Sequence, residues 1–230
     1  MTSLTIVMPV YNERETLRTA LDRLLAVEMP IDTEVLVVDD GSTDGCIETI
    51  QDLVDGGAVT LYVQNPNQGK GAALRRGIAE AKGDLLTILD ADLEYDPADF
   101  PALLRPILDG EANVVYGARS YGGHAAYSFW FVLGNKMLAL WASLLFDAWL
   151  TDIETCLKVA PTSHWRKVDL RSNGFGIEAE LTGKLLAMRE RIFEVPISYR
   201  ARGREEGKKI QWTDGVAALW ILLRIRLRGK

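Results

Sequence analysis

Short apolar runs alternate with amphipathic stretches along the first half of the chain. The runs at 4–10, 34–39, 59–64, 85–89 and 113–116 have the length and the aliphatic, largely β-branched content of strands. Amphipathic helical segments separate them, so strand and helix take turns. This alternation predicts a doubly wound, mainly parallel α/β sheet. In such sheets ligands bind at the carboxyl ends of the strands, where the first four runs meet polar residues or glycine.

The second half is less regular and contains two unusual segments. Residues 129–150 are strongly apolar, and a span of a bilayer needs about 20 such residues. Lys136 and Asp147 interrupt this segment, and charges at that depth are costly, so we expect a core helix or a helix at a membrane surface. Residues 216–230 mix large apolar side chains with arginines and fit an interfacial or partner-packing helix. We therefore expect one domain over 1–212 and a basic amphipathic helix over 213–230.

Carboxylates follow the fourth apolar run at every second position. If the chain stays extended there, Asp90, Asp92 and Glu94 project to one side and their oxygens converge. Such a hard oxygen set suits Mg²⁺ or Mn²⁺. A calcium-binding loop is a poor alternative, because Tyr95 stands where such a loop requires glycine. A solvated acidic strand end is the other interpretation of the segment.

Composition and charge narrow the class of protein. A chain of 230 residues with 48% hydrophobic and 25% charged residues is typical of a one-domain globular enzyme. Its net charge of −6 argues against a nucleic-acid-binding protein. From residue 189 onward, however, 11 basic residues face 5 acidic ones, which points to an anion or an anionic surface as partner. Cys46 and Cys156 lack metal or redox spacing, and the start at Met1 shows no export leader, so we expect a cytoplasmic protein.

Four motifs at predicted strand ends carry a family resemblance. They are Pro9-Val10-Tyr11-Asn12-Glu13, Asp39-Asp40-Gly41-Ser42-Thr43-Asp44, Asn67-Gln68-Gly69-Lys70-Gly71 and Asp90-Ala91-Asp92. In this order they resemble a family 2 glycosyltransferase with the GT-A (Rossmann-like) fold. Gly117-Ala118-Arg119, Thr151-Asp152-Ile153-Glu154-Thr155 and the tail from Arg202 to Ile210 resemble the dolichyl-phosphate-mannose and dolichyl-phosphate-glucose synthase branch.

The resemblance implies a set of binding residues. For the nucleoside of a nucleotide-sugar donor these are Pro9, Tyr11, Glu13, Val38 and Asp40. For the diphosphate, reached through Mg²⁺ or Mn²⁺, they are Asp90, Ala91 and Asp92, with Lys70 nearby and Glu94 at a ligand position often held by glutamine. For phosphate groups they are Arg119, Arg202 and Lys208, because arginine binds phosphate bidentately and lysine as a point charge. Catalytic roles fall to Asp92, Asp152 and Arg119.

The implied reaction is an inverting transfer from a GDP-mannose or UDP-glucose type of donor to a polyprenyl phosphate. A phosphate monoester is already ionised near neutral pH, since its second pKa is about 6, and needs cations rather than a base. A soluble hydroxyl acceptor would need a carboxylate base, and the sequence leaves Asp152 and Glu154 as equal alternatives. A nucleotide-binding regulatory protein without turnover is the alternative outside the enzymes. Peripheral contact with the cytoplasmic face of a membrane is expected, and self-association is left open.

Overall fold

The computed structural model describes residues 2–119, 129–174, 176–200 and 212–228. The strands are β1 (Ser3–Val10), β2 (Asp32–Asp39), β3 (Thr60–Val63), β4 (Leu85–Ile88), β5 (Val114–Ala118), β6 (Lys158–Pro161) and β7 (Ile192–Pro196). The α-helices are α1 (Leu17–Leu25), α2 (Gln51–Asp55), α3 (Lys70–Glu80), α4 (Phe100–Leu108), α5 (Phe129–Phe146), α6 (Thr162–Lys167), α7 (Ile177–Ala187) and α8 (Trp212–Arg228). Two short 3₁₀ turns, η1 (Ile47–Ile50) and η2 (Pro97–Asp99), precede α2 and α4.

The described strands form one mixed sheet of seven strands in the order β3-β2-β1-β4-β6-β5-β7. β1 pairs in parallel with β2 and β4, β2 with β3, and β5 with β7. β6 is antiparallel to both of its neighbours, β4 and β5. The mainly parallel α/β sheet expected from the alternation is therefore confirmed. The sequence pattern did not reveal β6 or β7.

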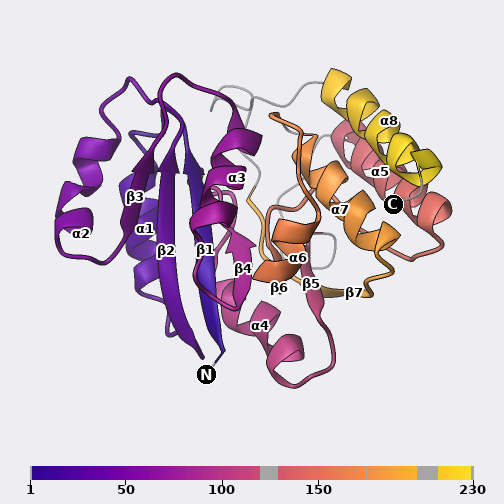
Figure 1. The fold of residues 1–230 in the computed structure, drawn as a ribbon, viewed down its shortest axis with the longest axis horizontal. Coiled ribbons are helices and arrows are strands. Elements are labelled where there is room, and N and C mark those ends of the chain that lie inside the picture. The colour runs from indigo at the N-terminus through magenta and orange to yellow at the C-terminus, as the bar shows by residue number, and fades with distance from the viewer. Residues whose placement is uncertain (1, 120–128, 175, 201–211, 229–230) are drawn as a thin grey trace.

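Burial on both faces explains the continuous apolar runs of the central strands. Ile6, Val7, Val37 and Leu86 are inaccessible to solvent and belong to one core. In Figure 1, α3 crosses in front of the sheet while α1 lies behind it. Helices on both faces leave the strands no solvent-facing side, so nearly every position is apolar. The carboxyl ends of β1 and β2 lie at the upper edge in this view, opposite the N-terminus.

The carboxylate segment after β4 does not continue as a strand. β4 ends at Ile88, and residues 91–94 form a turn in which Leu93 has a left-handed φ of 63°. The expectation that an extended chain aligns Asp90, Asp92 and Glu94 on one side is therefore wrong, because a turn redirects successive side chains. After the turn, Tyr95 forms an isolated antiparallel bridge with Tyr199, outside the strands of the sheet.

The two unusual segments of the second half are helices that pack on each other. α5 and α8 enclose a second core with α7, in which Ala142, Ile153, Ala179 and Leu222 are fully buried. Both helices lie at one end of the molecule (Figure 1). In the described chain, no helix is both long enough and apolar enough to cross a membrane. α5 is thus a partly buried helix with an exposed apolar side, on which Met137, Leu140 and Leu144 lie.

Candidate active site

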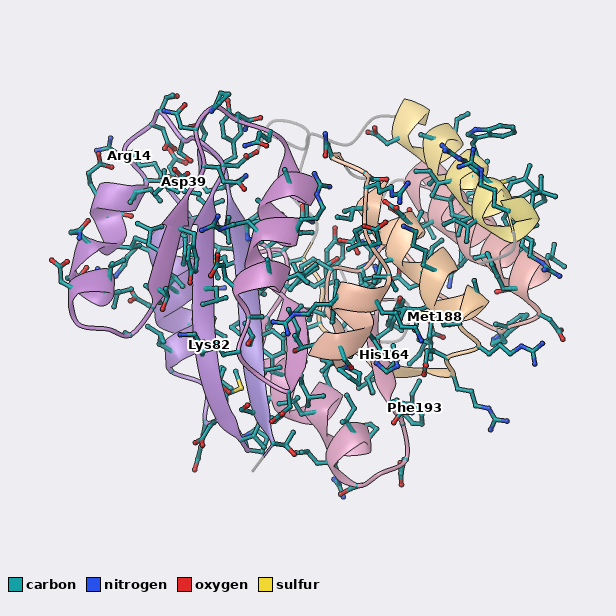
Figure 2. The ribbon with its side chains drawn as sticks, in the orientation of Figure 1. Arg14, Asp39, Lys82, His164, Met188 and Phe193 are labelled. Carbon is teal, nitrogen blue, oxygen red and sulfur yellow. The ribbon has the colours of Figure 1, made fainter. Side chains whose placement is uncertain are left out.

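The first motif and the second are tied together where β1 and β2 end. Figure 2 shows Arg14 and Asp39 at this upper edge of the sheet. The Asn12 side-chain oxygen accepts a 2.8 Å hydrogen bond from the Thr43 backbone N–H, and the Asn12 backbone N–H donates to Ser42 Oγ at 3.0 Å. Asn12 therefore fixes the 41–44 turn. α1 begins only at Leu17, so Asn12 does not cap that helix.

Asp40 is a buried anchor for the loop that carries the third motif. Its carboxylate accepts hydrogen bonds from the Gln68 and Gly69 backbone N–H groups at 2.9 and 2.7 Å and from Gln64 Nε2 at 2.8 Å. The side chain is only 2% exposed. These three donors leave the carboxylate little room for a ligand, and its expected contact with base and ribose stays a prediction. What the structure shows is that Asp40 holds the loop of the third motif against the end of β2.

The other residues expected at the nucleoside fall into two groups. Tyr11 is exposed, and Pro9 and Glu13 are half-buried, so all three lie at the surface of the strand edge. Val38, by contrast, is fully buried in the core, and its side chain is withdrawn from any ligand. Val38 therefore offers only its backbone to a nucleoside, and its expected contact with base and ribose stays a prediction. Ala91 is likewise buried at 2% exposure, which leaves only its backbone for a diphosphate.

The third and fourth motifs meet through an ion pair. Lys70, the first residue of α3, places its Nζ 2.8 Å from Asp90 Oδ2. A Cβ on Gly71 would lie 1.9 Å from the Ser172 carbonyl oxygen, so only glycine lets this turn pack beneath the 171–174 segment. Burial by itself lowers the pKa of Lys70, but Asp90 and then Glu178 more than reverse this and raise it above its ordinary value. Lys70 is therefore a permanent cation.

A second ion pair is buried next to Lys70, and its signal in the sequence is weak. Lys158 in β6 is fully buried and donates to Glu178, a first-turn residue of α7. Glu178 Oε1 lies 3.6 Å from Lys70 Nζ. A single lysine between Leu157 and Val159 in an apolar run is unusual, and this is the signal from which Lys158 could have been found. Glu178 carries no such signal, because the helix dipole by itself favours a glutamate in the first turn of a helix.

Arg119 and Asp152 form a two-point ion pair after β5. Nε donates to Oδ2 at 2.6 Å and Nη2 to Oδ1 at 2.8 Å, and the guanidinium also lies 4.9 Å from the Tyr199 ring centroid. Burial acts to raise the pKa of Asp152, but Arg119 outweighs it and keeps that pKa below its usual value. A carboxylate that is paired and easily ionised is a weak proton acceptor. Asp152 thus orients Arg119 rather than serving as a base.

Glu154 has the opposite electrostatic environment. Its Oε1 is buried and has no hydrogen-bond partner in the part of the chain described. Burial raises the pKa of Glu154 to about 7. The nearby Lys158 acts to lower this pKa, and Glu178 acts to raise it further. A base works best when its pKa is close to the operating pH. Of the two carboxylates that the sequence left as alternatives, Glu154 is therefore the one suited to accept a proton.

The three expected metal ligands do not come together as a set. Glu94 accepts a 2.6 Å hydrogen bond from the Tyr199 hydroxyl, and across the described ranges no three His, Cys, Asp or Glu residues are arranged to hold an ion. Asp90 and Asp92 remain as candidate ligands, separated by Ala91 where the chain leaves β4 and enters the turn. Mg²⁺ is usually bound by one or two carboxylates together with substrate phosphates. The donor chemistry thus fits a divalent cation whose ligand shell a diphosphate completes.

Arg202 and Lys208, the expected phosphate-binding residues of the tail, lie outside the described residues. The described range that precedes them ends at Arg200, whose backbone N–H donates to the Glu94 carbonyl oxygen at 2.9 Å. The segment that leads into the tail is therefore fastened to the carboxylate turn. Of Arg119, Arg202 and Lys208, only Arg119 lies within the described ranges.

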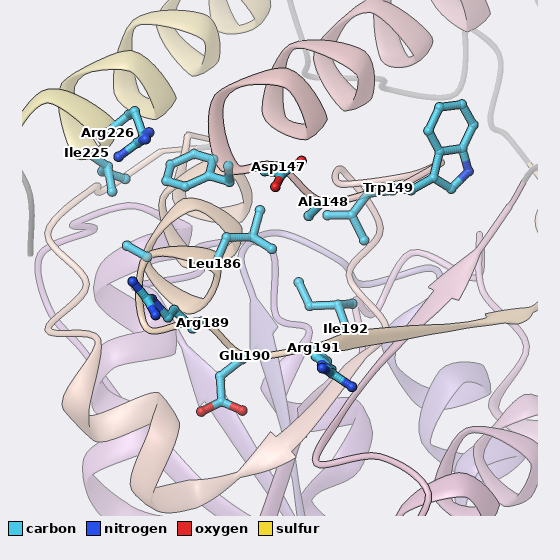
Figure 3. A pocket seen from close by; sticks show the side chains of 13 residues that line it. Asp147, Ala148, Trp149, Leu186, Arg189, Glu190, Arg191, Ile192, Ile225 and Arg226 are labelled. Carbon is cyan, nitrogen blue, oxygen red and sulfur yellow. The ribbon is translucent and has the colours of Figure 1, made fainter.

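A cavity of about 720 Å³ lies away from this edge, between the C-terminal ends of α5 and α7 and the helix α8 (Figure 3). Arg189, Arg191 and Arg226 reach into it, as do Asp147 and Glu190. Helix C-termini carry partial negative charge, which together with two carboxylates offsets the arginines. Arg226 donates to the Leu145 carbonyl oxygen at 2.7 Å, as expected of a residue that caps α5. We therefore assign these arginines to helix ends and not to a substrate.

Comparison with known proteins supplies the family. The model of "Glycosyl transferase family 2" matches residues 5–157, from β1 to the turn before β6. Dolichol-phosphate mannosyltransferase of Pyrococcus furiosus is 29% identical over 211 residues, which cover 88% of this chain and 58% of that protein. The Mycosarcoma maydis enzyme of the same name is 28% identical over 90% of this chain and 73% of its own length.

A third relative is similar over a shorter segment. Undecaprenyl-phosphate 4-deoxy-4-formamido-L-arabinose transferase of Aeromonas hydrophila is 39% identical over 46% of this chain and 33% of its own length. The chain thus matches between one third and three quarters of the length of these three relatives.

The fold also has solved counterparts. Glucosyl-3-phosphoglycerate synthase from Mycobacterium tuberculosis, crystallised with Mn²⁺, UDP and glucosyl-3-phosphoglycerate, superposes with a TM-score of 0.73 at 21% identity, over 97% of this chain and 80% of that one. The same enzyme has been crystallised with Mg²⁺ and UDP. The fold is therefore that of the GT-A glycosyltransferases. With the family match extending over most of the chain and its four motifs at one sheet edge, this protein belongs to glycosyl transferase family 2.

Proposed function

We propose that this chain transfers a sugar, with inversion, from a nucleoside-diphosphate sugar of the GDP-mannose or UDP-glucose type to a polyprenyl phosphate. The observation that carries the proposal is the shared edge: the family motifs of the described chain follow β1, β2, β3, β4 and β5 or precede the antiparallel strand β6, and these strand ends lie on the same side of the sheet. The named functions of the Pyrococcus and Mycosarcoma relatives support the choice of acceptor.

On the donor side, the chain's own groups are suited to a leaving diphosphate. Asp90 and Asp92 would hold Mg²⁺ or Mn²⁺, and the cation would act as a Lewis acid on the diphosphate. Lys70 lies beside Asp90 as a point charge for the same phosphates. Tyr11, Pro9 and Glu13 border the position for the nucleoside at the end of β1. Mn²⁺ and Mg²⁺ complexes of the structural neighbour support this assignment of the cation.

On the acceptor side, Arg119 is held ready for an anion. Asp152 engages Nε and Nη2 of the guanidinium, so Nη1 is not part of the pair. A guanidinium fixed in this way can bind a phosphate without first losing rotamer freedom. Arg202 and Lys208 would add further positive charge. A phosphate acceptor is already nucleophilic near neutral pH, so this reaction needs no base.

A hydroxyl acceptor is the second candidate, and Glu154 is the observation that favours it. Glu154 is half-buried, with Oε1 fully covered, and a carboxylate with a pKa of about 7 is poised to take a proton from a hydroxyl group. The structural neighbour bound to phosphoglyceric acid supports an acceptor of this soluble kind. A nucleotide-binding regulatory role has less support, because Asp90, Asp92 and Lys70 retain the charged groups that transfer from a cation-bound diphosphate requires.

Peripheral contact with a membrane completes the proposal. Trp149 at the end of α5 and Trp220 on α8 are 80% and 64% exposed. Arg224, Arg226 and Arg228 are exposed along the last turns of α8. Indole rings and arginines of this kind favour the boundary between anionic head groups and acyl chains. We place this surface at the cytoplasmic face of the membrane, where a polyprenyl phosphate would be reached.

Transfer of radiolabelled sugar followed by organic extraction tests the proposal. With Mn²⁺, a panel of UDP- and GDP-sugars and a polyprenyl phosphate, label should enter the organic phase. Label that remains in the aqueous phase with a hydroxyl acceptor would support the second candidate. Absence of transfer with either acceptor, while nucleotide still binds, would support the regulatory role.

A further inference from the structure

Four charged side chains of alternating sign run from the interior of the protein to the cation turn. Lys158 donates to the Ile153 carbonyl oxygen at 3.0 Å and to Glu178, and its ammonium lies 5.1 Å from the Tyr116 ring centroid. The second oxygen of Glu178 faces Lys70 at 3.6 Å. Lys70 then meets Asp90 at 2.8 Å. The series joins β6, α7, α3 and the turn after β4.

Burying the Lys158–Glu178 ion pair costs desolvation free energy, so its presence calls for an explanation other than stability. The Lys158 side chain is 0% exposed and that of Glu178 is 7% exposed. Buried ion pairs recover little more than their own desolvation, and apolar residues of similar size often replace them without loss of stability. The inner pair is thus not explained by stability. Its geometry, however, points one carboxylate oxygen at Lys70, and this oxygen has no hydrogen-bond partner in the described chain.

We propose that Lys158 and Glu178 are positioning residues that hold the Lys70 ammonium beside Asp90. Because Glu178 shares this ammonium, Lys70 does not neutralise Asp90 completely. Because two carboxylates share Lys70, Asp90 retains negative charge for a divalent cation. Lys70 in turn stays in place to meet the diphosphate. This inference rests on the proposed function, since it assigns a role in binding the cation and the diphosphate.

The anchoring of α7 supports such a role. Glu180, on the same first turns of the helix, accepts from the Arg171 and Ser172 backbone N–H groups at 3.1 and 2.7 Å. That segment packs directly on Gly71, next to Lys70. One helix start thereby holds both the backbone and the ammonium of the third motif. A shift of α7 would move Lys70 relative to Asp90.

The test is a variant that removes the inner pair without changing net charge, Lys158→Met with Glu178→Gln. Calorimetric titration of the full chain with Mn²⁺ and UDP or GDP measures binding directly, and thermal unfolding measures stability. We expect near-normal stability, because both buried charges leave together. The dissociation constant should rise about 10- to 100-fold, the usual effect of losing a residue that supports a metal ligand.

Two further variants keep the result interpretable. His164→Leu breaks the 2.9 Å pair with Glu190 at the other end of α7, and it should bind Mn²⁺ and nucleotide normally. Glu178→Asp keeps both charges but withdraws the carboxylate from Lys70, so it should weaken binding even if the double variant does not fold. Normal binding by the folded double variant would overturn this inference but not the proposed function. If the double variant does not fold, normal binding by Glu178→Asp would have the same meaning. Failure of the wild type to bind either nucleotide would overturn the proposed function and this inference with it.

Discussion

Asp152 holds Arg119 through two hydrogen bonds, Nε to Oδ2 at 2.6 Å and Nη2 to Oδ1 at 2.8 Å, and both side chains are buried. A buried guanidinium that loses its carboxylate is left as an uncompensated charge, which typically costs about 3–5 kcal/mol. We therefore expect Asp152→Asn to lower the free energy of unfolding by about that amount, measured in urea.

Asp22→Asn is the matched control for this prediction. It breaks the exposed 2.9 Å pair with Arg18, and exposed pairs contribute about 0–1 kcal/mol. A loss of stability in Asp152→Asn no larger than in this control would contradict the structural role of the pair. Transfer should fall in Asp152→Asn as well, because an unpaired Arg119 is free to leave its position.

Asp92→Ala should abolish transfer and Mn²⁺-dependent nucleotide binding while leaving the fold intact. Asp90 and Asp92 are the two carboxylates assigned to the cation, which would lose half of its protein ligands without Asp92. Asp96→Ala serves as the control from the same segment, since Asp96 Oδ1 accepts from the Ala98 N–H at 3.0 Å and caps a helical turn. That variant should lose about 1 kcal/mol of stability and keep its activity. Full turnover of Asp92→Ala in excess chelator would refute the cation assignment.

Glu154 predicts a dependence of stability on pH. Its pKa is about 7 in the folded protein and about 4.3 in an unfolded chain, so the folded state binds more protons between these values. The contribution of Glu154 is therefore fully present below about pH 4 and is lost as pH rises through 7.

The Glu154→Gln variant removes this dependence. We expect it to be more stable than wild type at pH 8 by about 1–3 kcal/mol, with the difference shrinking toward pH 5. Thermal unfolding across this range measures it. The same variant should lose transfer to a hydroxyl acceptor but keep transfer to a phosphate acceptor. Parallel stability curves for both proteins would show that Glu154 titrates normally.

Trp149→Ser and Trp220→Ser should weaken binding to anionic vesicles. Both indoles are exposed at the α5–α8 end, and arginines there add attraction that salt screens over about 8–10 Å. Sedimentation with anionic and neutral vesicles, at low and high salt, measures the effect. Val63→Ser, which removes a 63% exposed apolar side chain from the distant strand β3, should bind as the wild type does. Equal partitioning with both vesicle types at every salt concentration would leave α5 and α8 a packing role only.

Arg202→Ala and Lys208→Ala should lower transfer to polyprenyl phosphate far more than they lower stability. Two phosphate-bearing substrates need more positive charge than one cation supplies, so we expect the loss of either side chain to act on transfer rather than on folding. Hydrogen exchange over residues 200–210 should slow when nucleotide-sugar and Mn²⁺ are present. If both variants have near-normal kinetics and hydrogen exchange is unchanged, the tail does not contribute to the acceptor site.

The sequence by itself determined the sheet and the edge at which the site lies. The run 35–38 is apolar at every position because a parallel strand is covered on both faces, so local pattern is enough to identify such strands. Parallel strands with helical crossovers then place all their carboxyl ends together, whatever the details of packing. Lys70 and Asp90 could be assigned to one site on this basis alone.

Only the tertiary structure decided which side chains pair within that site. Glu94 and Tyr199 are 105 positions apart, and their hydrogen bond depends on the path of every segment between them. The turn at Leu93 likewise overrode the alternation that would have aligned three carboxylates. No periodicity encodes such contacts.

The same limit applied to the choice between Asp152 and Glu154. Two carboxylates two residues apart have similar sequence surroundings, but one is paired with Arg119 while the other is buried with an unsatisfied oxygen. Desolvation and neighbouring charge set a pKa, and both depend on the packed interior rather than on the local sequence. Lys158 and Glu178, whose charges meet only because β6 and α7 come together, are a product of the fold in the same sense.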